Sequence, residues 1–134
     1  CGGHLIATDT PKHIYSHARY GSHNYDHKTD CDWTIEAPLG KNVHLTFLSF
    51  QLEYEEDCAY DFVEVYSGLD ASSPSYGKFC DSNITDIVSM NEALLIRFRT
   101  DDTISNKGFS AAFVAVDRQD SDENLGGIDE EENL

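Results

Sequence analysis

The sequence of 134 residues lacks several features that would point to common protein classes. It has no apolar run of about 18 residues, which argues against a transmembrane helix, and no window in which apolar residues recur with helical spacing. Its four cysteines form no CxxC pair, which argues against a zinc ribbon. A signal peptide is also absent. We therefore interpret the chain, which opens on Cys1, as a fragment of a longer secreted protein or as a mature domain.

Motifs for catalysis are missing as well. The sequence contains no Gly-x-Ser-x-Gly elbow and no glycine-rich phosphate loop. His13, His17, His23 and His27 include two pairs with i, i+4 spacing, but no helical period supports a zinc clamp and no HExxH motif occurs. The histidines are better interpreted as solvated loop residues, and the chain as non-catalytic.

Basic residues are scarce. Nine Lys and Arg stand against 25 Asp and Glu, which gives a formal net charge of −16 and an isoelectric point near 4.4. Such a chain repels nucleic acid and anionic membranes, so cations and basic protein surfaces are the expected partners. Residues 117–134 hold eight acidic residues and one Arg without any period. We expect one domain over residues 1–116 and a disordered acidic tail over 117–134.

The even number of cysteines fits two disulfides in an oxidising compartment, and the residues alone leave three pairings open. Asn83 begins an Asn-Ile-Thr acceptor for N-glycosylation in a polar stretch where a surface loop is plausible. Together these features indicate a secreted, extracellular protein.

Short β-strands are predicted along most of the chain. Residues 1–30 have the composition of an extended loop with one short strand at Leu5 and Ile6. The stretch 43–52 changes the parity of its apolar residues, which predicts either a β-bulge or burial on both faces. Trp33 and Ile35 are expected in the core, and 68–77 is expected to be a loop. Further strands are predicted at 32–37, 61–66, 93–98 and 109–116. An all-β fold, an antiparallel β-sandwich, fits this pattern best.

The most unusual stretch is 52–66, which places five carboxylates within nine residues, beside Cys58 and before a predicted strand. Unneutralised carboxylates repel one another, so such a stretch is solvated, paired with bases or wrapped around a cation. Tyr54 and Tyr60 flank it, either as an aromatic interaction surface or as packing near the Cys58 disulfide. Asp101 and Asp102 supply another acidic pair after a later apolar run.

Several separate motifs resemble the CUB domain family. They are Cys1-Gly2-Gly3, Cys31-Asp32-Trp33, the run from Cys58 to Val63, Tyr66-Ser67-Gly68, Cys80, and Phe98 to Asp102 before Gly108-Phe109. The resemblance implies an extracellular β-sandwich of the CUB-like jelly-roll type with the pairings Cys1–Cys31 and Cys58–Cys80. Two shorter phrases, residues 15–21 and 105–109, are most similar to the C-terminal CUB domain of the tolloid-type astacin metalloproteinases, the procollagen C-proteinases.

The resemblance also implies a calcium site. The family's acidic ligands fall on Glu53, Asp61 and Asp101, and Tyr25 matches a tyrosine that hydrogen-bonds them. Thr103 and Ile104 match positions that complete the shell, where Ile104 offers only its backbone carbonyl. Calcium prefers such oxygen ligands. Asp102, Tyr54 and Tyr60 are candidates for supporting the site or contacting a partner.

We therefore predict a non-catalytic, calcium-binding module that recognises Lys or Arg side chains of extracellular partners, such as matrix proteins or growth-factor antagonists. The resemblance implies that it recruits substrates for a tolloid-like metalloproteinase whose active site lies outside this chain. In an alternative interpretation, calcium only stabilises loops and the geometry of neighbouring domains. A third, an enzyme in its own right, is disfavoured by the missing motifs.

Overall fold

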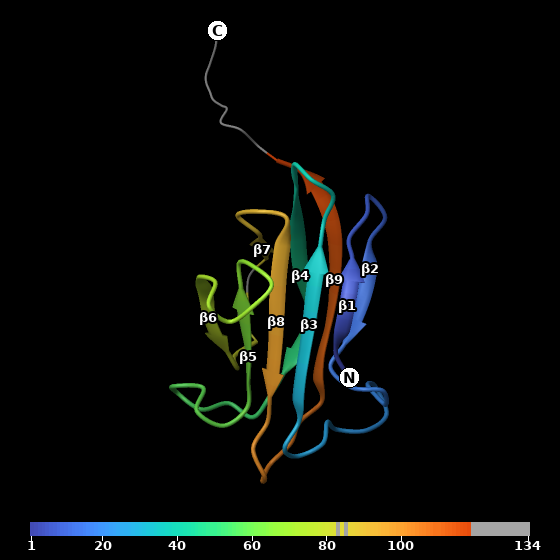
Figure 1. The fold of residues 1–134 in the computed structure, drawn as a ribbon. Coiled ribbons are helices and arrows are strands. Elements are labelled where there is room, and N and C mark those ends of the chain that lie inside the picture. The colour runs from blue at the N-terminus through green and yellow to red at the C-terminus, as the bar shows by residue number, and fades with distance from the viewer. Residues whose placement is uncertain (83, 85, 119–134) are drawn as a thin grey trace, which may run out of the picture.

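The computed structural model describes residues 1–82, 84 and 86–118, and within these residues the chain forms nine β-strands in two sheets (Figure 1). One sheet has the strand order β1-β3-β8-β5-β6 and the other β2-β9-β4-β7. All pairings are antiparallel except that of β1 with β3. The predicted all-β sandwich is confirmed. The strands are β1 (Gly3–Ile6), β2 (Lys12–Tyr15), β3 (Asp30–Glu36), β4 (Lys41–Gln51), β5 (Phe62–Tyr66), β6 (Ser75–Phe79), β7 (Ile87–Val88), β8 (Ala93–Arg99) and β9 (Gly108–Asp117).

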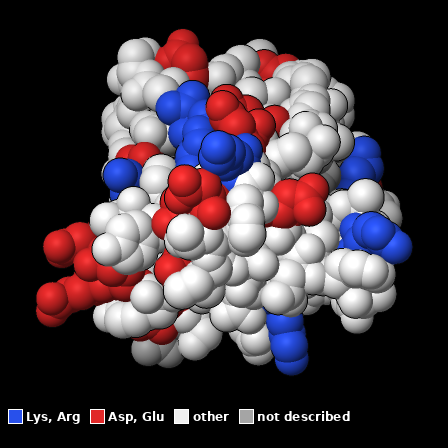
Figure 2. All heavy atoms as spheres, turned by 90° about the horizontal axis from the view of Figure 1, so that it is seen from below, with Lys and Arg blue, Asp and Glu red and all other residues white. Residues whose placement is uncertain are grey.

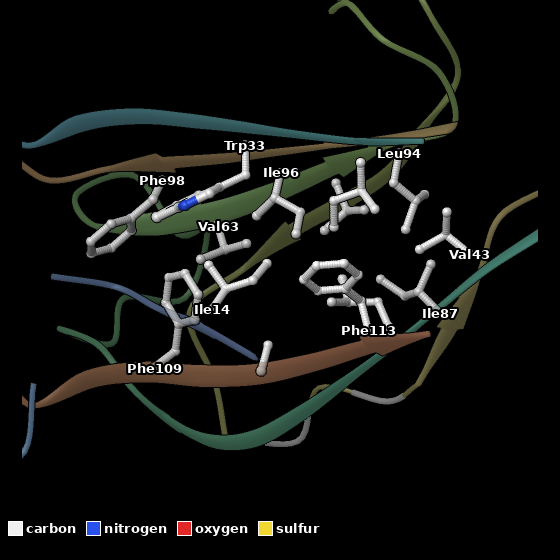
Figure 3. Close-up of a cluster of buried hydrophobic side chains, with 14 of the residues drawn as sticks. Ile14, Trp33, Val43, Val63, Ile87, Leu94, Ile96, Phe98, Phe109 and Phe113 are labelled. Atoms are coloured by element: carbon white, nitrogen blue, oxygen red, sulfur yellow. The ribbon is translucent and has the colours of Figure 1, made fainter. Parts of the chain in front are cut away.

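The core lies between the two sheets, because alternate residues of each long strand point inward (Figure 3). Trp33 and Ile35 of β3 are buried, as predicted, and the Trp33 ring meets the Phe109 ring of β9 edge to face at 5.8 Å. Phe98 of β8 packs on the same Phe109 ring at 5.3 Å. Each such aromatic side chain contributes about 2–3 kcal/mol through burial, so this cluster holds the two sheets together.

The change of parity in β4 is a β-bulge, one of the two outcomes predicted. The pairing of β4 with β9 shifts register between Phe47 and Ser49, and Leu48 is left 57% exposed. The extra residue allows Leu45 before the bulge and Phe50 after it both to face the core. The bulge therefore explains why the apolar residues change parity along one continuous strand.

The expected loop over residues 1–30 is wrong in part. It contains β1, near the predicted position, but also β2, which pairs with β9. Only Ile14 of β2 is buried, so the strand depends on its ladder to β9 and carries almost no apolar signal of its own. The expected loop at 68–77 likewise ends early, because β6 begins at Ser75 and pairs with β5.

Two disulfides, Cys1–Cys31 and Cys58–Cys80, fasten the fold, with the pairing that the resemblance implied. At the other end of the chain β9 continues to Asp117, one residue past the expected domain boundary, and Asp117 forms an ion pair with Lys41 at 2.8 Å. Arg118 contacts Glu92 at 2.8 Å. The rest of the expected tail, residues 119–134, lies outside the described residues.

Candidate metal centre

Three loops meet at the end of the sandwich that is lowest in Figure 1: residues 16–29 before β3, residues 52–61 before β5 and residues 100–107 after β8. The strand register explains part of this meeting. Phe62 at the start of β5 pairs with Arg99 at the end of β8. Asp61 and Asp101, which flank this pair, therefore lie at the same end although forty positions separate them.

The structure brings together the three acidic residues predicted as metal ligands. One carboxylate oxygen from each of Glu53, Asp61 and Asp101 lies within 4.8 Å of the other two. Asp61 is fully buried, whereas Glu53 and Asp101 are partly exposed. A calcium ion with oxygens at about 2.4 Å holds opposite ligands about 4.8 Å apart, so the separation fits one ion.

Tyr25 fixes the orientation of this cluster. Its hydroxyl donates to Asp61 Oδ2 at 2.6 Å and accepts the Glu53 amide at 3.0 Å. The other oxygen of Asp61 accepts the Asp101 amide at 2.9 Å. The Tyr25 ring is itself buried and packs edge to face on Phe98 at 5.4 Å. The core thus holds the tyrosine, and the tyrosine holds two of the three acidic segments.

The electrostatics of the cluster disfavour three bare carboxylates. Burial raises the pKa of Glu53, and the neighbouring charges of Asp101 and Asp61 raise it further. Burial also raises the pKa of Asp61, although hydrogen bonds from Tyr25 and the Asp101 amide oppose that shift. Burial and the hydrogen bond to Asp61 raise the pKa of Tyr25. A site that must keep its carboxylates ionised therefore gains from a cation.

One oxygen atom of the cluster is consistent with such a cation. Glu53 Oε1 is the buried side-chain oxygen that has no hydrogen-bond partner among the described residues. A buried carboxylate oxygen without a partner costs free energy, and a cation between the three carboxylates would satisfy it. Oxygen is the only donor element that the three side chains offer, so the cluster suits a hard divalent cation.

The other residues predicted at the site lie around the cluster. The Thr103 amide donates to Asp101 Oδ1 at 3.2 Å, and the Ile104 side chain is 64% exposed. Asp102 is exposed too. Tyr54 and Tyr60 are 63% and 50% exposed, so both present aromatic surface to solvent. Asn83 lies outside the described residues.

Hydrogen bonds and a disulfide hold the acidic loop before β5. Glu55 Oε1 accepts the amides of Asp57 and Ala59, both at 2.9 Å, and the Cys58 amide donates to the Glu55 carbonyl. The Cys58–Cys80 disulfide joins this loop to the end of β6. Figure 2 views the molecule from this end and shows acidic side chains projecting along one side of it.

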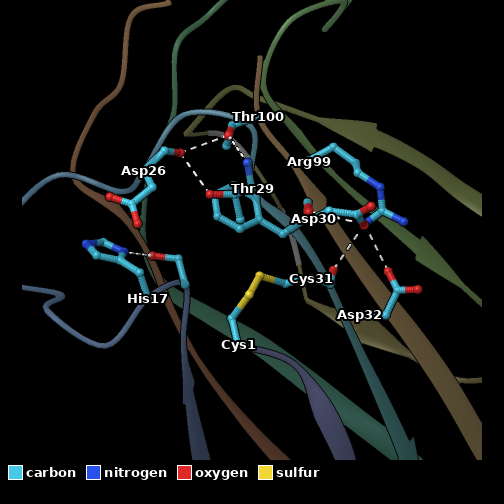
Figure 4. The surroundings of a disulfide bond; sticks show 11 residues. Cys1, His17, Asp26, Thr29, Asp30, Cys31, Asp32, Arg99 and Thr100 are labelled. Atoms are coloured by element: carbon cyan, nitrogen blue, oxygen red, sulfur yellow. Dashed lines mark hydrogen bonds and ion pairs between the residues drawn. A yellow bond between two sulfur atoms is a disulfide. The ribbon is translucent and has the colours of Figure 1, made fainter. Parts of the chain in front are cut away.

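Contacts that join the three loops were not predicted from the sequence. The Lys28 amide donates to the Asp101 carbonyl at 2.7 Å. The Thr100 hydroxyl donates to the Asp26 carbonyl at 2.9 Å, as Figure 4 shows. Asn106 Nδ2 donates to the Leu52 carbonyl at 3.3 Å. Most of the groups in these hydrogen bonds belong to the backbone. Every residue has such groups, so residue types do not predict which of them will bond. Only Thr100 and Asn106, whose polar side chains make two of these contacts, offered a signal.

A basic pair next to the Cys1–Cys31 disulfide was also missed. Arg99 contacts Asp30 at 2.8 Å and Asp32 at 3.0 Å, and Arg97 contacts Asp32 at 3.3 Å; Figure 4 shows the Arg99 contacts. These arginines face acids of β3 on the outer surface of the larger sheet. Among the described residues, their ion pairs are with Asp30 and Asp32 and not with the three-carboxylate cluster.

The histidines take no part in the cluster. Both ring nitrogens of His17 have partners, Ser16 Oγ and the His23 carbonyl, each at 2.7 Å. Among the described residues, Glu53, Asp61 and Asp101 make up the one group arranged to hold a metal ion, and it includes no histidine. Over the same residues we find no helix long and apolar enough to cross a membrane.

Comparison with known proteins identifies the family. A family model for the CUB domain matches residues 1–113. Tolloid-like protein 2 of Homo sapiens is 48% identical over 122 residues, which are 90% of this chain and 12% of that protein. The dorsal-ventral patterning protein tolloid of Drosophila melanogaster is 41% identical over 118 residues, 87% of this chain and 11% of that protein. This chain therefore corresponds to a small part of these relatives.

A solved structure agrees in fold. The crystal structure of the MASP-1 CUB2 domain bound to Ca²⁺ matches with a TM-score of 0.70 and 26% identity, and the match covers 85% of this chain and 99% of that domain. The predicted resemblance to CUB domains, and to tolloid-like proteins among them, is thus confirmed. The chain belongs to the CUB domain family.

Proposed function

We propose that the chain is a calcium-binding recognition module of a secreted, tolloid-like protein. Glu53, Asp61 and Asp101 supply carboxylate oxygens to the ion, and Thr103 and the Ile104 carbonyl complete the shell. The buried, unpartnered Glu53 Oε1 within a cluster of three carboxylates is the observation that carries this proposal. The MASP-1 CUB2 domain, whose crystal structure is described as bound to Ca²⁺, supports it by analogy.

The calcium ion prepares the site for a basic partner. It holds the acidic side chains in place, and their outward oxygens then accept hydrogen bonds from a lysine or arginine of another extracellular protein. Charge-assisted bonds of this type are stronger than neutral ones, and a preorganised acceptor lowers the entropy cost of binding. Asp102, Tyr54 and Tyr60 extend the surface around the cluster. A net charge of −16 favours the approach of basic partners.

The module itself is non-catalytic, as CUB domains are, and its relatives are many times longer than the chain. We propose that it recruits substrates, such as matrix proteins or growth-factor antagonists, for a zinc metalloproteinase encoded elsewhere in the parent protein. Several such modules in one chain would raise the overall affinity through avidity.

Calcium titration tests the metal site. We expect calcium to bind with a Kd of roughly 10⁻⁴ to 10⁻³ M, and a hundredfold excess over Kd to add about 2.7 kcal/mol to the free energy of unfolding. Magnesium should add far less. Glu53→Gln should weaken calcium binding at least tenfold, whereas Glu56→Gln, which changes an exposed acid of the same loop, should leave it unchanged. Equal calcium affinity in both variants would refute the site.

A second experiment separates recognition from simple stabilisation. Pull-downs with a panel of matrix proteins and growth-factor antagonists are compared with and without EDTA. Asp102→Asn combined with Tyr54→Ala should retain calcium affinity and lose partner binding, because both side chains are exposed beside the cluster. If partners bind equally well in EDTA and to this variant, calcium has only the structural role.

A further inference from the structure

A second candidate binding surface lies along the edge of the sandwich formed by β1 and β2, which adjoin in Figure 1 but belong to different sheets. The seam between them opens into a groove of about 680 Å³. Leu5, His13, Tyr15, Tyr20 and the edge of Trp33 are among the residues that line it. At one end Lys12 Nζ donates to the Ile6 carbonyl across the seam at 2.8 Å. We call this surface the seam groove.

The hydrogen-bond pattern of β2 leaves part of its backbone without a strand partner. The Ser16 amide, one residue past β2, donates to the Phe109 carbonyl at 2.9 Å, and the Phe109 amide donates to Ser16 Oγ, so Ser16 stands opposite Phe109 at a hydrogen-bonded position of the β2–β9 register. Hydrogen-bonded pairs alternate in an antiparallel ladder. The next such pair is therefore Ile14 with Ala111, and the N–H and C=O groups of His13 and Tyr15 point away from β9.

Nothing in the described part of the chain covers these groups. β2 is the terminal strand of its sheet, and no loop or side chain of the described residues bonds to the backbone of His13 or Tyr15. An unpaired edge of this kind accepts an extended backbone as an additional strand. The N–H and C=O groups of His13 and Tyr15 alternate along the strand edge. This spacing matches the backbone of another strand and not the polar groups of a compact small molecule.

The side walls of the seam groove are aromatic and already ordered. The Tyr15 and Tyr20 rings lie 5.5 Å apart, and the His13 and Tyr15 rings are stacked at 6.5 Å. The Tyr20 hydroxyl is hydrogen-bonded to Ser49 of β4. Tyr15 is 51% exposed although it stands next to a core residue, Ile14. Rigid aromatic side chains supply contact area at low entropy cost.

The charge of the chain determines which extended segments the seam groove favours. Among the described residues that line the seam groove, none is Asp, Glu, Lys or Arg, whereas the chain as a whole carries −16. A groove without Asp, Glu, Lys or Arg among its described lining residues, in a strongly acidic protein, favours a neutral or basic segment and repels an acidic one. A second copy of the same chain would bring a further −16 and is disfavoured for the same reason.

We propose that the seam groove binds an extended, neutral or basic peptide segment of a partner protein as an additional strand on the free edge of β2. The segment pairs with the backbone of His13 and Tyr15, and its alternate side chains contact the aromatic wall. This site does not involve the candidate calcium ligands, so its binding is independent of calcium and of the function proposed above.

The test begins with a phage-displayed library of random heptapeptides, panned on the whole chain in EDTA and counter-selected on Tyr15→Pro. Tyr15→Pro removes the outward amide but no hydrogen bond of the β2–β9 ladder, so β2 tolerates it as an edge strand. Tyr15→Thr removes the same ring and keeps the amide. We expect selected peptides to bind Tyr15→Pro at least tenfold more weakly than Tyr15→Thr, while calcium affinity is the same in both variants.

Amide hydrogen exchange on the wild-type chain provides a second readout that needs no variant. The selected peptide should slow exchange at His13 and Tyr15 and leave that of Ile14 unchanged, because the Ile14 amide already bonds to β9. The proposal is overturned if panning yields no peptide that distinguishes the two variants or if these two amides are not protected. Sedimentation that shows a dimer in which the same amides are protected without peptide would also overturn it.

Discussion

Tyr25 connects the hydrophobic core to the candidate calcium site through one hydroxyl group. That hydroxyl donates to Asp61 and accepts from the Glu53 amide, while the ring rests on Phe98. Its position six residues before Cys31 made it predictable from the family pattern. That it joins two acidic segments at once was not predictable, because one of its partners is a backbone amide.

Tyr25→Phe should therefore damage the site more than the fold. The change keeps the ring packing but leaves Asp61 Oδ2 and the Glu53 amide without their partner. Loss of a residue that orients metal ligands typically lowers metal affinity 10- to 100-fold, and the stability cost should be about 1–3 kcal/mol. Isothermal titration with calcium and thermal unfolding in EDTA measure the two effects. Tyr54→Phe, at an exposed tyrosine, is the control, and equal affinity in both variants would contradict this role.

Gly108 is a second residue whose identity is set by its surroundings. It has a φ of +92°, and a Cβ atom there would approach Ser16 Oγ to 2.1 Å. Ser16 is fully buried and accepts the Phe109 amide at 3.0 Å. Gly77 has a similar φ of +112° but open space around it. A comparison of substitutions at the two glycines therefore distinguishes the stability cost of backbone strain from that of steric exclusion.

We expect Gly108→Ala to cost clearly more stability than Gly77→Ala. Strain in the left-handed region alone costs about 1–3 kcal/mol and applies to both variants. Only Gly108→Ala also displaces Ser16, which is bonded to the backbone of β9, so its cost should be larger by at least 1 kcal/mol, roughly the value of one buried hydrogen bond. Urea unfolding at neutral pH measures the difference. Equal losses would show that Ser16 adjusts without cost.

Strands β3 and β8 form a well predicted part of the fold, because burial alternates along β3 and β8 is rich in buried apolar residues. On their outer face Asp32 lies beside Arg97 and Arg99. Partial burial alone would raise the pKa of Asp32, but hydrogen bonds from the two arginines outweigh it and lower the pKa below its ordinary value. Because of these hydrogen bonds, the contribution of Asp32 to the stability of the fold depends on pH.

The direction of this pH dependence follows from the linkage between folding and proton binding. A carboxylate whose pKa is depressed by folding contributes stability above its unfolded-state pKa, and this contribution disappears as the pH falls through the folded-state value. Wild type should thus be more stable than Asp32→Asn at pH 7, by less than about 1 kcal/mol because the Asp32 side chain is 41% exposed. The difference should begin to shrink below about pH 4, near the unfolded-state pKa, and vanish only below the lower folded-state pKa. Urea unfolding of both proteins across this range would disprove the assignment if the difference stayed constant.

Strands without an apolar pattern explain most of what the sequence could not predict. β2, β6 and β7 are two to five residues long, and β7 consists of Ile87 and Val88 alone. Each exists because a neighbouring strand offers a ladder: β9 for β2, β5 for β6 and β4 for β7. A ladder is a property of two distant segments, so single-sequence periodicity cannot reveal it. The seam groove, whose wall is β2, was invisible for the same reason.

The two disulfides of the molecule hold different segments of the chain. Cys58–Cys80 closes 22 residues of chain and holds the acidic loop that contributes to the candidate calcium site. Cys1–Cys31 closes 30 residues and joins the N-terminus to β3 beside the arginine pair (Figure 4). Loop-closure entropy assigns each a similar contribution of about 3.5 kcal/mol, because that contribution grows only with the logarithm of loop length.

Removing either disulfide should therefore cost similar stability but have different effects on calcium. The Cys58→Ala/Cys80→Ala variant frees the loop between Glu53 and Asp61, so calcium must order that loop on binding, and we expect a loss of affinity of at least tenfold. In the Cys1→Ala/Cys31→Ala variant β3 is still held by its full ladder to β8, so calcium affinity should change less than threefold. Unfolding and calcium titration at a temperature where both variants remain folded compare the two. If both lost calcium affinity equally, the metal site would depend on the stability of the sandwich as a whole and not on the loop that the second disulfide restrains.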